Sequence, residues 1–203
     1  MHILIAGIHT GIGKTICSAV ICQALGLDYW KPVQAGDLDN SDSIFIKRNV
    51  INPSCKIHPE RYRLSIPASP HYAAAQDDIE IKRSDFILPH TNNSLVVETA
   101  GGIMSPLAKN FLNIDLMEQL KLPVILVSNN YLGSINHTLL TVAALQQRNI
   151  FVSGLVFSGE AVDATRNYIL EHTKLPLLFS IPFFKKIDSD AIAAFAKTVS
   201  INL

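Results

Sequence analysis

The glycine-rich segment from Gly7 to Thr15, which reads Gly-Ile-His-Thr-Gly-Ile-Gly-Lys-Thr, constrains what this chain can fold into more than any other stretch. It follows the apolar run 3–6, which is typical of a buried strand, and precedes a helical pattern over 14–26. Such a turn directs backbone N–H groups at a helix N-terminus, where a phosphate chain binds. Lys14 can reach the terminal phosphates, and the Thr15 hydroxyl can coordinate Mg²⁺. We therefore favour a nucleotide site over the plainer interpretation of a glycine turn that only caps a helix.

The spacing inside this loop departs from the general phosphate-loop pattern. That pattern has four residues between its glycines, whereas five, residues 8–12, separate Gly7 from Gly13 here. The loop alone therefore predicts phosphate binding without defining the chemistry, which other segments must supply.

Composition and charge restrict the class of protein. With 203 residues, 48% of them hydrophobic and 17% charged, we expect one globular domain over residues 1–203. The 17 basic and 17 acidic residues cancel, so no global field attracts nucleic acid or an anionic membrane surface. We see no apolar run of membrane-spanning length and no signal-like start. Three cysteines without CxxC spacing favour reduced thiols and a cytoplasmic location.

Apolar runs alternate with helical patterns along the chain. We expect strands at 2–7, 28–33, 94–98, 123–128, 152–157 and 177–181. We expect helices at 14–26, 42–49, 69–76, 113–121, 134–148, 161–173 and 188–199, with Asn113, Ser134 and Ser189 as N-caps. This alternation predicts an α/β fold of the P-loop NTPase type, with a mainly parallel central sheet and helices on both faces. The proline-rich region 50–92 is interpreted as an excursion over the ligand site.

Polar side chains follow several expected strands, where parallel sheets bind their ligands. Lys31 interrupts an apolar strand, so its charge needs a partner or a ligand, although a surface lysine at a sheet edge is the alternative. Asp42 could cap the next helix or bind a metal, and Glu98 ends a strand before a glycine-rich turn. Mg²⁺ prefers one or two carboxylates together with phosphate oxygens and water. Thr15, Asp42 and Glu98 therefore predict a Mg²⁺ site.

The turn after the strand 123–128 offers a further anion site. The backbone N–H groups from Gly133 to Thr138 lie at an expected helix start and could bind a carboxylate. Asn136 and His137 could equally be surface residues of that helix, and the residues alone leave both interpretations open.

Together these segments resemble one known family, dethiobiotin synthase. The motifs occur in the family's order over nearly the whole chain: Gly7-x5-Gly13-Lys14-Thr15, Tyr29-Trp30-Lys31-Pro32-Val33, Ser41-Asp42, Ser69-Pro70-His71, Glu98-x-Ala100-Gly101-Gly102 and Leu132-Gly133-x-Ile135-Asn136-His137-Thr138. The five-residue spacing of the phosphate loop is the family's own, and Lys-Pro-Val beside Leu-Gly-x-Ile-Asn-His is specific to it.

The resemblance implies an ATP-dependent ligase of biotin synthesis. Such enzymes close the ureido ring of dethiobiotin on 7,8-diaminononanoate with CO2 (or bicarbonate), ATP and Mg²⁺. One amine forms a carbamate, which takes the γ-phosphoryl group as a mixed anhydride, and the second amine then closes the ring. The family works as a homodimer with its site near the interface.

The resemblance also implies roles for individual residues. Lys14, Lys31 and Thr10 would be catalytic, with Thr10 and Lys31 also holding substrate. Thr15, Asp42 and Glu98 would hold Mg²⁺. The other residues expected to contact the nucleotide are Gly11, Ile12, Gly13, Ile16, Thr99, Ala100, Gly101, Ser158, Gly159, Pro182, Phe183 and Phe184. The other residues expected to contact the substrate are Ala35 and Tyr168, together with Gly133 and Asn136 from the partner subunit.

Several positions depart from the family's pattern. Ala35 stands where a Ser or Thr usually contacts substrate, and His9, Gly11 and Thr99 also replace common residues. Ser158 ends a strand where the family often has an Asn that reads the adenine edge. A hydroxyl replaces the paired donor and acceptor of an amide. We therefore expect weak adenine discrimination, and measurable activity with other nucleoside triphosphates.

The alternative class is a P-loop switch ATPase of the partitioning or targeting type. Such loops carry an additional lysine near their start, where residues 8–10 of this chain are Ile, His and Thr. A GTPase would need Asn-Lys-x-Asp, and residues 129–132 read Asn-Asn-Tyr-Leu. A glutaminase-linked ligase is disfavoured by the chain length. A degenerate binding protein is disfavoured by the retained Lys14, Thr15, Lys31, Asp42 and Glu98.

Overall fold

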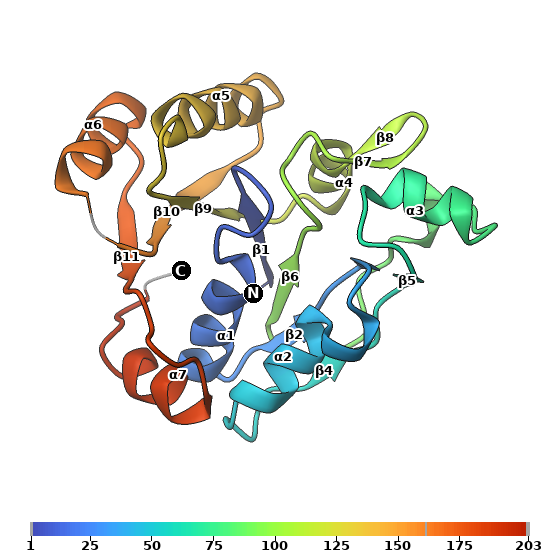
Figure 1. The fold of residues 1–203 in the computed structure, drawn as a ribbon, viewed down its shortest axis with the longest axis horizontal. Coiled ribbons are helices and arrows are strands. Elements are labelled where there is room, and N and C mark those ends of the chain that lie inside the picture. The colour runs from blue at the N-terminus through green and yellow to red at the C-terminus, as the bar shows by residue number, and fades with distance from the viewer. Residues whose placement is uncertain (1, 161, 202–203) are drawn as a thin grey trace.

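A seven-stranded sheet in the order β11-β10-β9-β1-β6-β2-β4 forms the centre of the fold (Figure 1). The computed structural model describes residues 2–160 and 162–201. All neighbouring strands of this sheet run parallel, so each connection crosses over one of its faces. The strands are β1 (His2–Gly7), β2 (Asp28–Trp30), β4 (Ile57–His58), β6 (Leu95–Glu98), β9 (Val124–Asn129), β10 (Val152–Ser158) and β11 (Leu177–Ile181).

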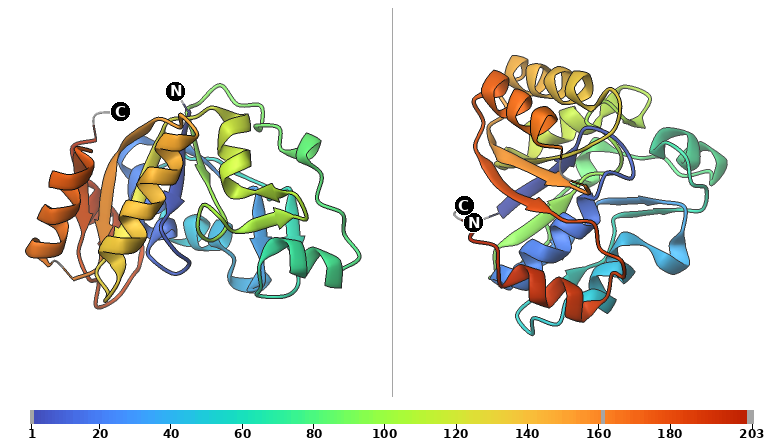
Figure 2. Two further views of the ribbon diagram at one scale, coloured as in Figure 1. Left: turned by 90° about the horizontal axis from the view of Figure 1, so that it is seen from above. Right: turned by 60° about the vertical axis from the view of Figure 1, so that its left-hand side comes forward.

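Helices cover both faces of the sheet (Figures 1 and 2). One layer consists of α1 (Lys14–Leu25), α2 (Asp42–Asn49) and α7 (Ser189–Ala196), and the other of α4 (Asn113–Leu120), α5 (Ser134–Gln147) and α6 (Asp163–Thr173). The buried strand β1 contributes side chains to the hydrophobic cores on both faces of the sheet, because successive side chains of a strand point to opposite faces. Ile3 and Ile5 pack toward α1 and α7, whereas Leu4 and Ala6 pack toward α4 and α5. The expected α/β fold, with a mainly parallel sheet and helices on both faces, is confirmed.

A smaller layer lies beside the sheet, next to β2. It contains the parallel pair β3 (Val33–Ala35) and β5 (Tyr62–Leu64), the antiparallel pair β7 (Pro106–Ala108) and β8 (Phe111–Leu112), helix α3 (Pro70–Gln76) and the 3-10 turns at Leu38–Asn40 and Arg83–Asp85. Its own core includes Leu64, Phe86 and Phe111. The region 50–92 thus adds β4 to the main sheet and β5 to this layer, two short strands that the sequence did not predict.

The expected element boundaries needed several corrections. The strand expected at 28–33 is two strands, β2 and β3, separated by Lys31 and by Pro32, which lacks an N–H group for a sheet. Asn113, Ser134 and Ser189 are each the first residue of a helix, so their prediction as N-caps was wrong. Asp188 caps α7 instead, because its carboxylate accepts from the Ala191 N–H at 3.0 Å. The start expected for α6 at residue 161 lies outside the described residues.

In the described part of the chain, no helix has the length and apolar character to cross a bilayer.

Strand β2 is fixed at its first residue by a buried carboxylate. Asp28 is only 2% exposed. Its oxygens lie 2.7 Å from the Thr91 hydroxyl, 2.9 Å from His58 Nε2, and 3.0 Å from Asn93 Nδ2 and the Lys56 N–H. Burial alone raises the pKa of Asp28, but these hydrogen bonds outweigh it and the pKa is lowered. The ionised form therefore stabilises the fold.

We predict that Asp28→Asn lowers the free energy of unfolding by about 2–3 kcal/mol at pH 7, because donors then face an amide instead of a charged acceptor. The contribution of a carboxylate with a lowered folded-state pKa is present above the ordinary value of about 3.9 and is lost as pH falls through the folded value. Urea unfolding should thus show a difference in the free energy of unfolding between wild type and Asp28→Asn at pH 7, and this difference should shrink in acid. Asp39→Asn, at an exposed aspartate, is the matched control. An equal deficit at both pH values would contradict the prediction.

Candidate active site

The phosphate-type loop connects β1 to α1 and depends on two of its glycines. Gly13 precedes α1 with a φ of 98°, a left-handed conformation that glycine adopts without strain. At Gly7, a Cβ atom would lie 2.8 Å from Ile12 Cδ1 and 3.0 Å from Lys14 Cδ. The loop therefore curls tightly over the end of β1, and its backbone approaches the start of α1.

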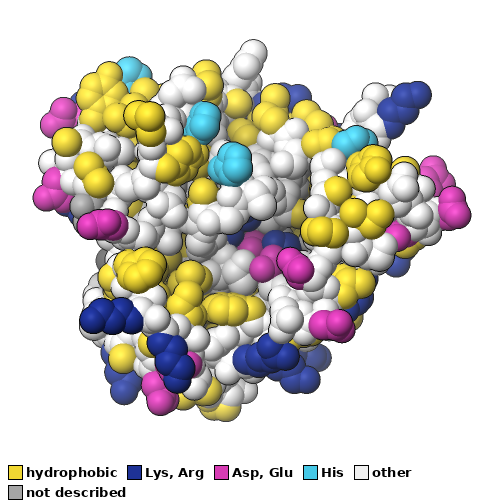
Figure 3. Space-filling view, viewed as in Figure 1, with side chains coloured by type: hydrophobic (Ala, Val, Ile, Leu, Met, Phe, Trp, Pro, Cys, Tyr) yellow, Lys and Arg dark blue, Asp and Glu magenta, His cyan; other side chains and the backbone are white. Residues whose placement is uncertain are grey.

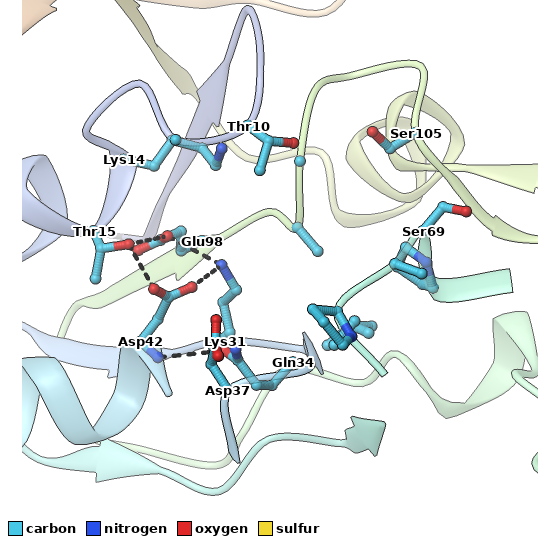
Figure 4. Close-up of a pocket in the computed structure, with 18 of the residues that line it drawn as sticks. Thr10, Lys14, Thr15, Lys31, Gln34, Asp37, Asp42, Ser69, Glu98 and Ser105 are labelled. Carbon is cyan, nitrogen blue, oxygen red and sulfur yellow. Dashed lines mark hydrogen bonds and ion pairs between the residues drawn. The ribbon is translucent and has the colours of Figure 1, made fainter. Parts of the chain in front are cut away.

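Four polar side chains from different elements meet beside this loop (Figure 4). The Thr15 hydroxyl lies 2.8 Å from Asp42 Oδ1 and 3.0 Å from Glu98 Oε1. Lys31 Nζ lies 2.5 Å from Asp42 Oδ2 and 3.1 Å from Glu98 Oε1. Lys31 is buried with 4% exposure, so the interpretation of a surface lysine at a sheet edge is wrong. The cluster joins α1, α2, β6 and the segment after β2.

The charges of the cluster stabilise one another. Burial alone lowers the pKa of Lys31, but Glu98 and Asp42 outweigh it, and the pKa is raised. Burial alone raises the pKa of Asp42, but the ion pair with Lys31 outweighs it, and the pKa is lowered.

The pKa of Lys14 shifts in the opposite direction to that of Lys31. Burial, together with the neighbouring charge of Lys31, lowers the pKa of Lys14 to about 8. With its Nζ bonded to the His9 carbonyl at 3.0 Å, Lys14 is a cation that an anion beside the loop would stabilise.

Glu98 is held in place from beneath. It is fully buried. While Oε1 faces Thr15 and Lys31, Oε2 accepts from the Ser18 hydroxyl at 2.8 Å and from the Tyr29 hydroxyl at 3.0 Å. Sequence reasoning missed both supporting residues. The periodicity could have found them, because Ser18 lies one helical turn after Lys14 and Tyr29 lies two residues before Lys31 in an extended segment.

A cavity of about 580 Å³ opens above the cluster. On this face of the molecule, acidic and basic side chains gather in a central hollow (Figure 3). Of the expected residues, the cavity is lined by Thr10, Gly11, Gly13, Lys14, Thr15, Lys31, Ala35, Asp42, Glu98, Ala100 and Gly101. Sequence reasoning did not name Gln34, Asp37, Ser69 and Ser105 as site residues, although they also line it. Ser69 and Ser105 lie across the cavity from Thr15 (Figure 4).

The remaining expected residues lie elsewhere. Ile12 and Thr99 are buried, and Ile16 packs against the core. Ser158 is the last residue of β10, Gly159 follows it, and residues 182–184 follow β11. In the sheet, β10 and β11 lie on the other side of β1 from β2, which leads to Lys31. Gly133, Asn136 and Tyr168 are exposed and line no part of this cavity. Within one chain, the structure therefore brings the phosphate-loop and Lys31 groups together but not the residues assigned to the substrate carboxylate.

The alternative roles of Asp42 can also be compared. Ser41 is the N-cap of α2, and its hydroxyl accepts from the Ile44 N–H at 3.3 Å. The Asp42 side chain instead faces Thr15 and Lys31. Hydroxyl and carboxylate oxygens are the hard ligands that Mg²⁺ prefers, and the hydrogen-bond distances given above gather three such groups at one point. The donor set therefore fits Mg²⁺.

Comparison with known proteins decides the family. A family model described as an AAA domain matches residues 1–191. The ATP-dependent dethiobiotin synthetase BioD of Chlamydia pneumoniae is 42% identical over 196 residues, which cover 97% of this chain and 88% of the relative. That of Cytophaga hutchinsonii is 45% identical over 193 residues, with coverages of 95% and 93%. The chain belongs to the dethiobiotin synthetase family. The resemblance drawn from the motifs is confirmed, and with it an ATP-dependent enzyme.

More distant solved structures share the fold of this dethiobiotin synthetase family member. A ParA family ATPase from Chlorobium tepidum aligns with a TM-score of 0.58 at 12% identity, over 98% of this chain and 99% of that one. The cell division protein MinD from Aquifex aeolicus aligns with a TM-score of 0.56 at 16% identity, over 100% and 99%. Identities this low show a common fold alone, so the alternative of a partitioning ATPase has support in fold and not in function.

We predict that Tyr29→Phe lowers the free energy of unfolding by about 2 kcal/mol, because a buried carboxylate loses one of its charged hydrogen bonds. Chemical unfolding of the variant and the wild type measures the difference. Tyr72→Phe, at a tyrosine that is 50% exposed, should leave stability within about 0.5 kcal/mol of wild type. Equal stability of Tyr29→Phe and wild type would show that Glu98 does not depend on this hydroxyl.

Proposed function

We propose that this enzyme closes the ureido ring of dethiobiotin on 7,8-diaminononanoate, with CO2 and ATP as co-substrates, as a step of biotin synthesis. Family membership supports this reaction class. The observation that carries the proposal is the position of Lys31, whose buried ammonium lies between Asp42 and Glu98 and lines the same cavity as Lys14 and the phosphate loop. Two cations beside a phosphate loop suit the transfer of a phosphoryl group between two anions.

In the proposed reaction, one amine of the substrate adds CO2 to form a carbamate and releases a proton. The carbamate oxygen then attacks the γ-phosphorus of ATP, and ADP leaves with the electron pair of the broken P–O bond. The second amine attacks the carbonyl carbon of this mixed anhydride, and phosphate leaves as the ring closes. Lys31 would hold the carbamate, Lys14 would bridge it and the γ-phosphate, and Thr10 would hydrogen-bond the substrate. Positioning and charge neutralisation would supply most of the catalysis.

Thr15, Asp42 and Glu98 would hold Mg²⁺, in keeping with their oxygen donors. When bound, the ion would neutralise phosphate charge and help to orient the phosphate chain. The phosphates would contact the loop residues 11–16 and the turn 99–101. Ser158, Gly159 and residues 182–184 would line the side of the base.

The substrate carboxylate would bind at Gly133 and Asn136 of the partner subunit, with Ala35 and Tyr168 as further contacts. The exposure of Asn136, and its absence from the lining of the cavity, support a site that a second subunit completes. We further propose that residues 1–203 form a single domain and that two copies of the chain associate as a homodimer. A cytoplasmic location is supported by the free thiols of Cys17, Cys22 and Cys55.

We predict that the enzyme, 7,8-diaminononanoate, labelled bicarbonate, ATP and Mg²⁺ together yield labelled dethiobiotin, ADP and phosphate by mass spectrometry. Lys31→Ala should lower kcat by a factor on the order of 10²–10³, since a charge contact in the transition state is removed. Lys47→Ala, at an exposed lysine of α2, is the matched control. Absence of labelled product from the wild type would refute the function, and near-normal turnover by Lys31→Ala would refute the role of Lys31.

We also predict complementation between subunits. Lys31→Ala and Asn136→Ala proteins should each be weakly active, whereas dimers exchanged between them should recover about a quarter of wild-type turnover, because half of the dimers carry one intact site of two. Steady-state assays after unfolding and refolding the mixture measure the recovery. Activity no greater than the mean of the two variants would place both residues in the same subunit's site.

A further inference from the structure

Ser158, the last residue of β10, packs its side chain against the phosphate loop. Ser158 is only 6% exposed. It lies against the phosphate loop so closely that a Cβ atom at Gly13 would come within 2.8 Å of Ser158 Cβ. The next residue, Gly159, has no side chain. Neither residue therefore extends a side chain from this strand end toward a nucleotide base.

The neighbouring strand supplies an amide at the same level. Asn129, the last residue of β9, is the register partner of Ser158. Its side chain lies across the Gly159 backbone, because a Cβ atom at Gly159 would be 3.1 Å from Asn129 Oδ1 and 3.6 Å from Nδ2. Gly159 itself has a φ of 92°, and its N–H donates to the Ile181 carbonyl at 2.9 Å. The amide thus lies where the ends of β9, β10 and β11 converge.

The side-chain amide of Asn129 is free to donate and accept further hydrogen bonds. Asn129 is half-buried, and within residues 2–160 and 162–201 its side chain makes no hydrogen bond. The adjacent Asn130 differs, since its Nδ2 donates to the Glu160 carbonyl. A half-buried amide without a partner is costly to desolvate, and a ligand that offers a matching donor and acceptor relieves that cost.

The surroundings suit a flat heterocycle. Phe183 lies two residues after the end of β11 and is 77% exposed, in contrast to Phe184, which packs edge-on against Phe195. The sheet order places β10 and β11 on the side of the phosphate loop away from the carboxylate and lysine cluster. A nucleotide with its terminal phosphate at that cluster would therefore direct its base toward these strand ends.

We propose that Asn129 reads the base of the bound nucleotide through its side-chain amide. The inference rests on the proposed function for the presence of ATP. The amide oxygen accepts from adenine N6–H, and the amide N–H donates to adenine N1. Base discrimination then resides on β9 and does not require an amide at position 158, so the weak discrimination expected from Ser158 is replaced by a preference for adenine.

The test measures binding of non-hydrolysable ATP and GTP analogues by calorimetry. Wild type should prefer the ATP analogue, and Asn129→Ala should bind it about tenfold more weakly, the effect of one lost hydrogen-bonded contact. Asn129→Asp removes the donor that adenine N1 needs and offers two acceptors to guanine N1–H and N2–H. Its ratio of ATP to GTP affinity should therefore shift toward GTP by about tenfold or more. Asn130→Ala is the matched control and should keep the wild-type ratio.

A second measurement is independent of any shift in stability. Wild type should bind an analogue whose adenine N1 is replaced by CH about tenfold more weakly than the parent nucleotide, and that difference should vanish in Asn129→Ala. An unchanged base preference in both Asn129 variants, or an N1 effect that persists in Asn129→Ala, overturns the inference. Because binding needs no ring closure, selective binding without dethiobiotin formation would refute the proposed function and leave this inference standing.

Discussion

The contact between Lys31 and the two carboxylates Asp42 and Glu98 is the interaction on which the rest of the site depends. A buried ammonium is costly unless it is paired and hydrogen-bonded. Here two acceptors, at 2.5 and 3.1 Å, meet that requirement. The same two carboxylates also face Thr15, through Asp42 Oδ1 and Glu98 Oε1, so the binding site of the protein's own lysine lies beside a donor set that suits Mg²⁺. The pairing keeps Lys31 charged and holds its ammonium group in a defined position.

The sheet topology makes this arrangement possible. β1, β6 and β2 are neighbours in the sheet although they lie far apart in sequence. Their carboxyl ends therefore deliver the phosphate loop, Glu98 and Lys31 to one edge, as expected for parallel sheets. Ala35 and Ser69 of the side layer also line the cavity, and Ser69 lies across it from Thr15 (Figure 4). A different order of the strands would separate the phosphate loop, Glu98 and Lys31.

Much of the fold and part of the site could be predicted from the sequence. Strong local signals, such as the apolar run of β1 followed by glycines, identify elements because the backbone there has few alternatives. Thr15, Asp42 and Glu98 were grouped by their chemistry, and the structure brings them together. Ser18 and Tyr29 escaped notice because their role depends on which face of α1 and β2 meets Glu98. The cavity residues Ser69 and Ser105 precede α3 and β7 of the side layer. The Ser69 motif and the helix after it could be read from the sequence, but how this layer packs against the phosphate loop depends on tertiary contacts. Asn129 was missed because its position over Gly159 follows from strand register, which tertiary packing sets.

Strand β2 is only three residues long, yet its first residue is the buried carboxylate Asp28, and the buried ammonium of Lys31 follows its last residue. Asp28 is tied to His58, Thr91 and Asn93, and Lys31 is tied to Asp42 and Glu98. A strand of that length spans about 10 Å, too short to absorb a displacement by bending. Buried polar contacts therefore fix the strand at both of its ends. We therefore expect sequence changes that loosen the contacts of Asp28 also to shift Lys31, three residues along the chain, relative to Asp42 and Glu98.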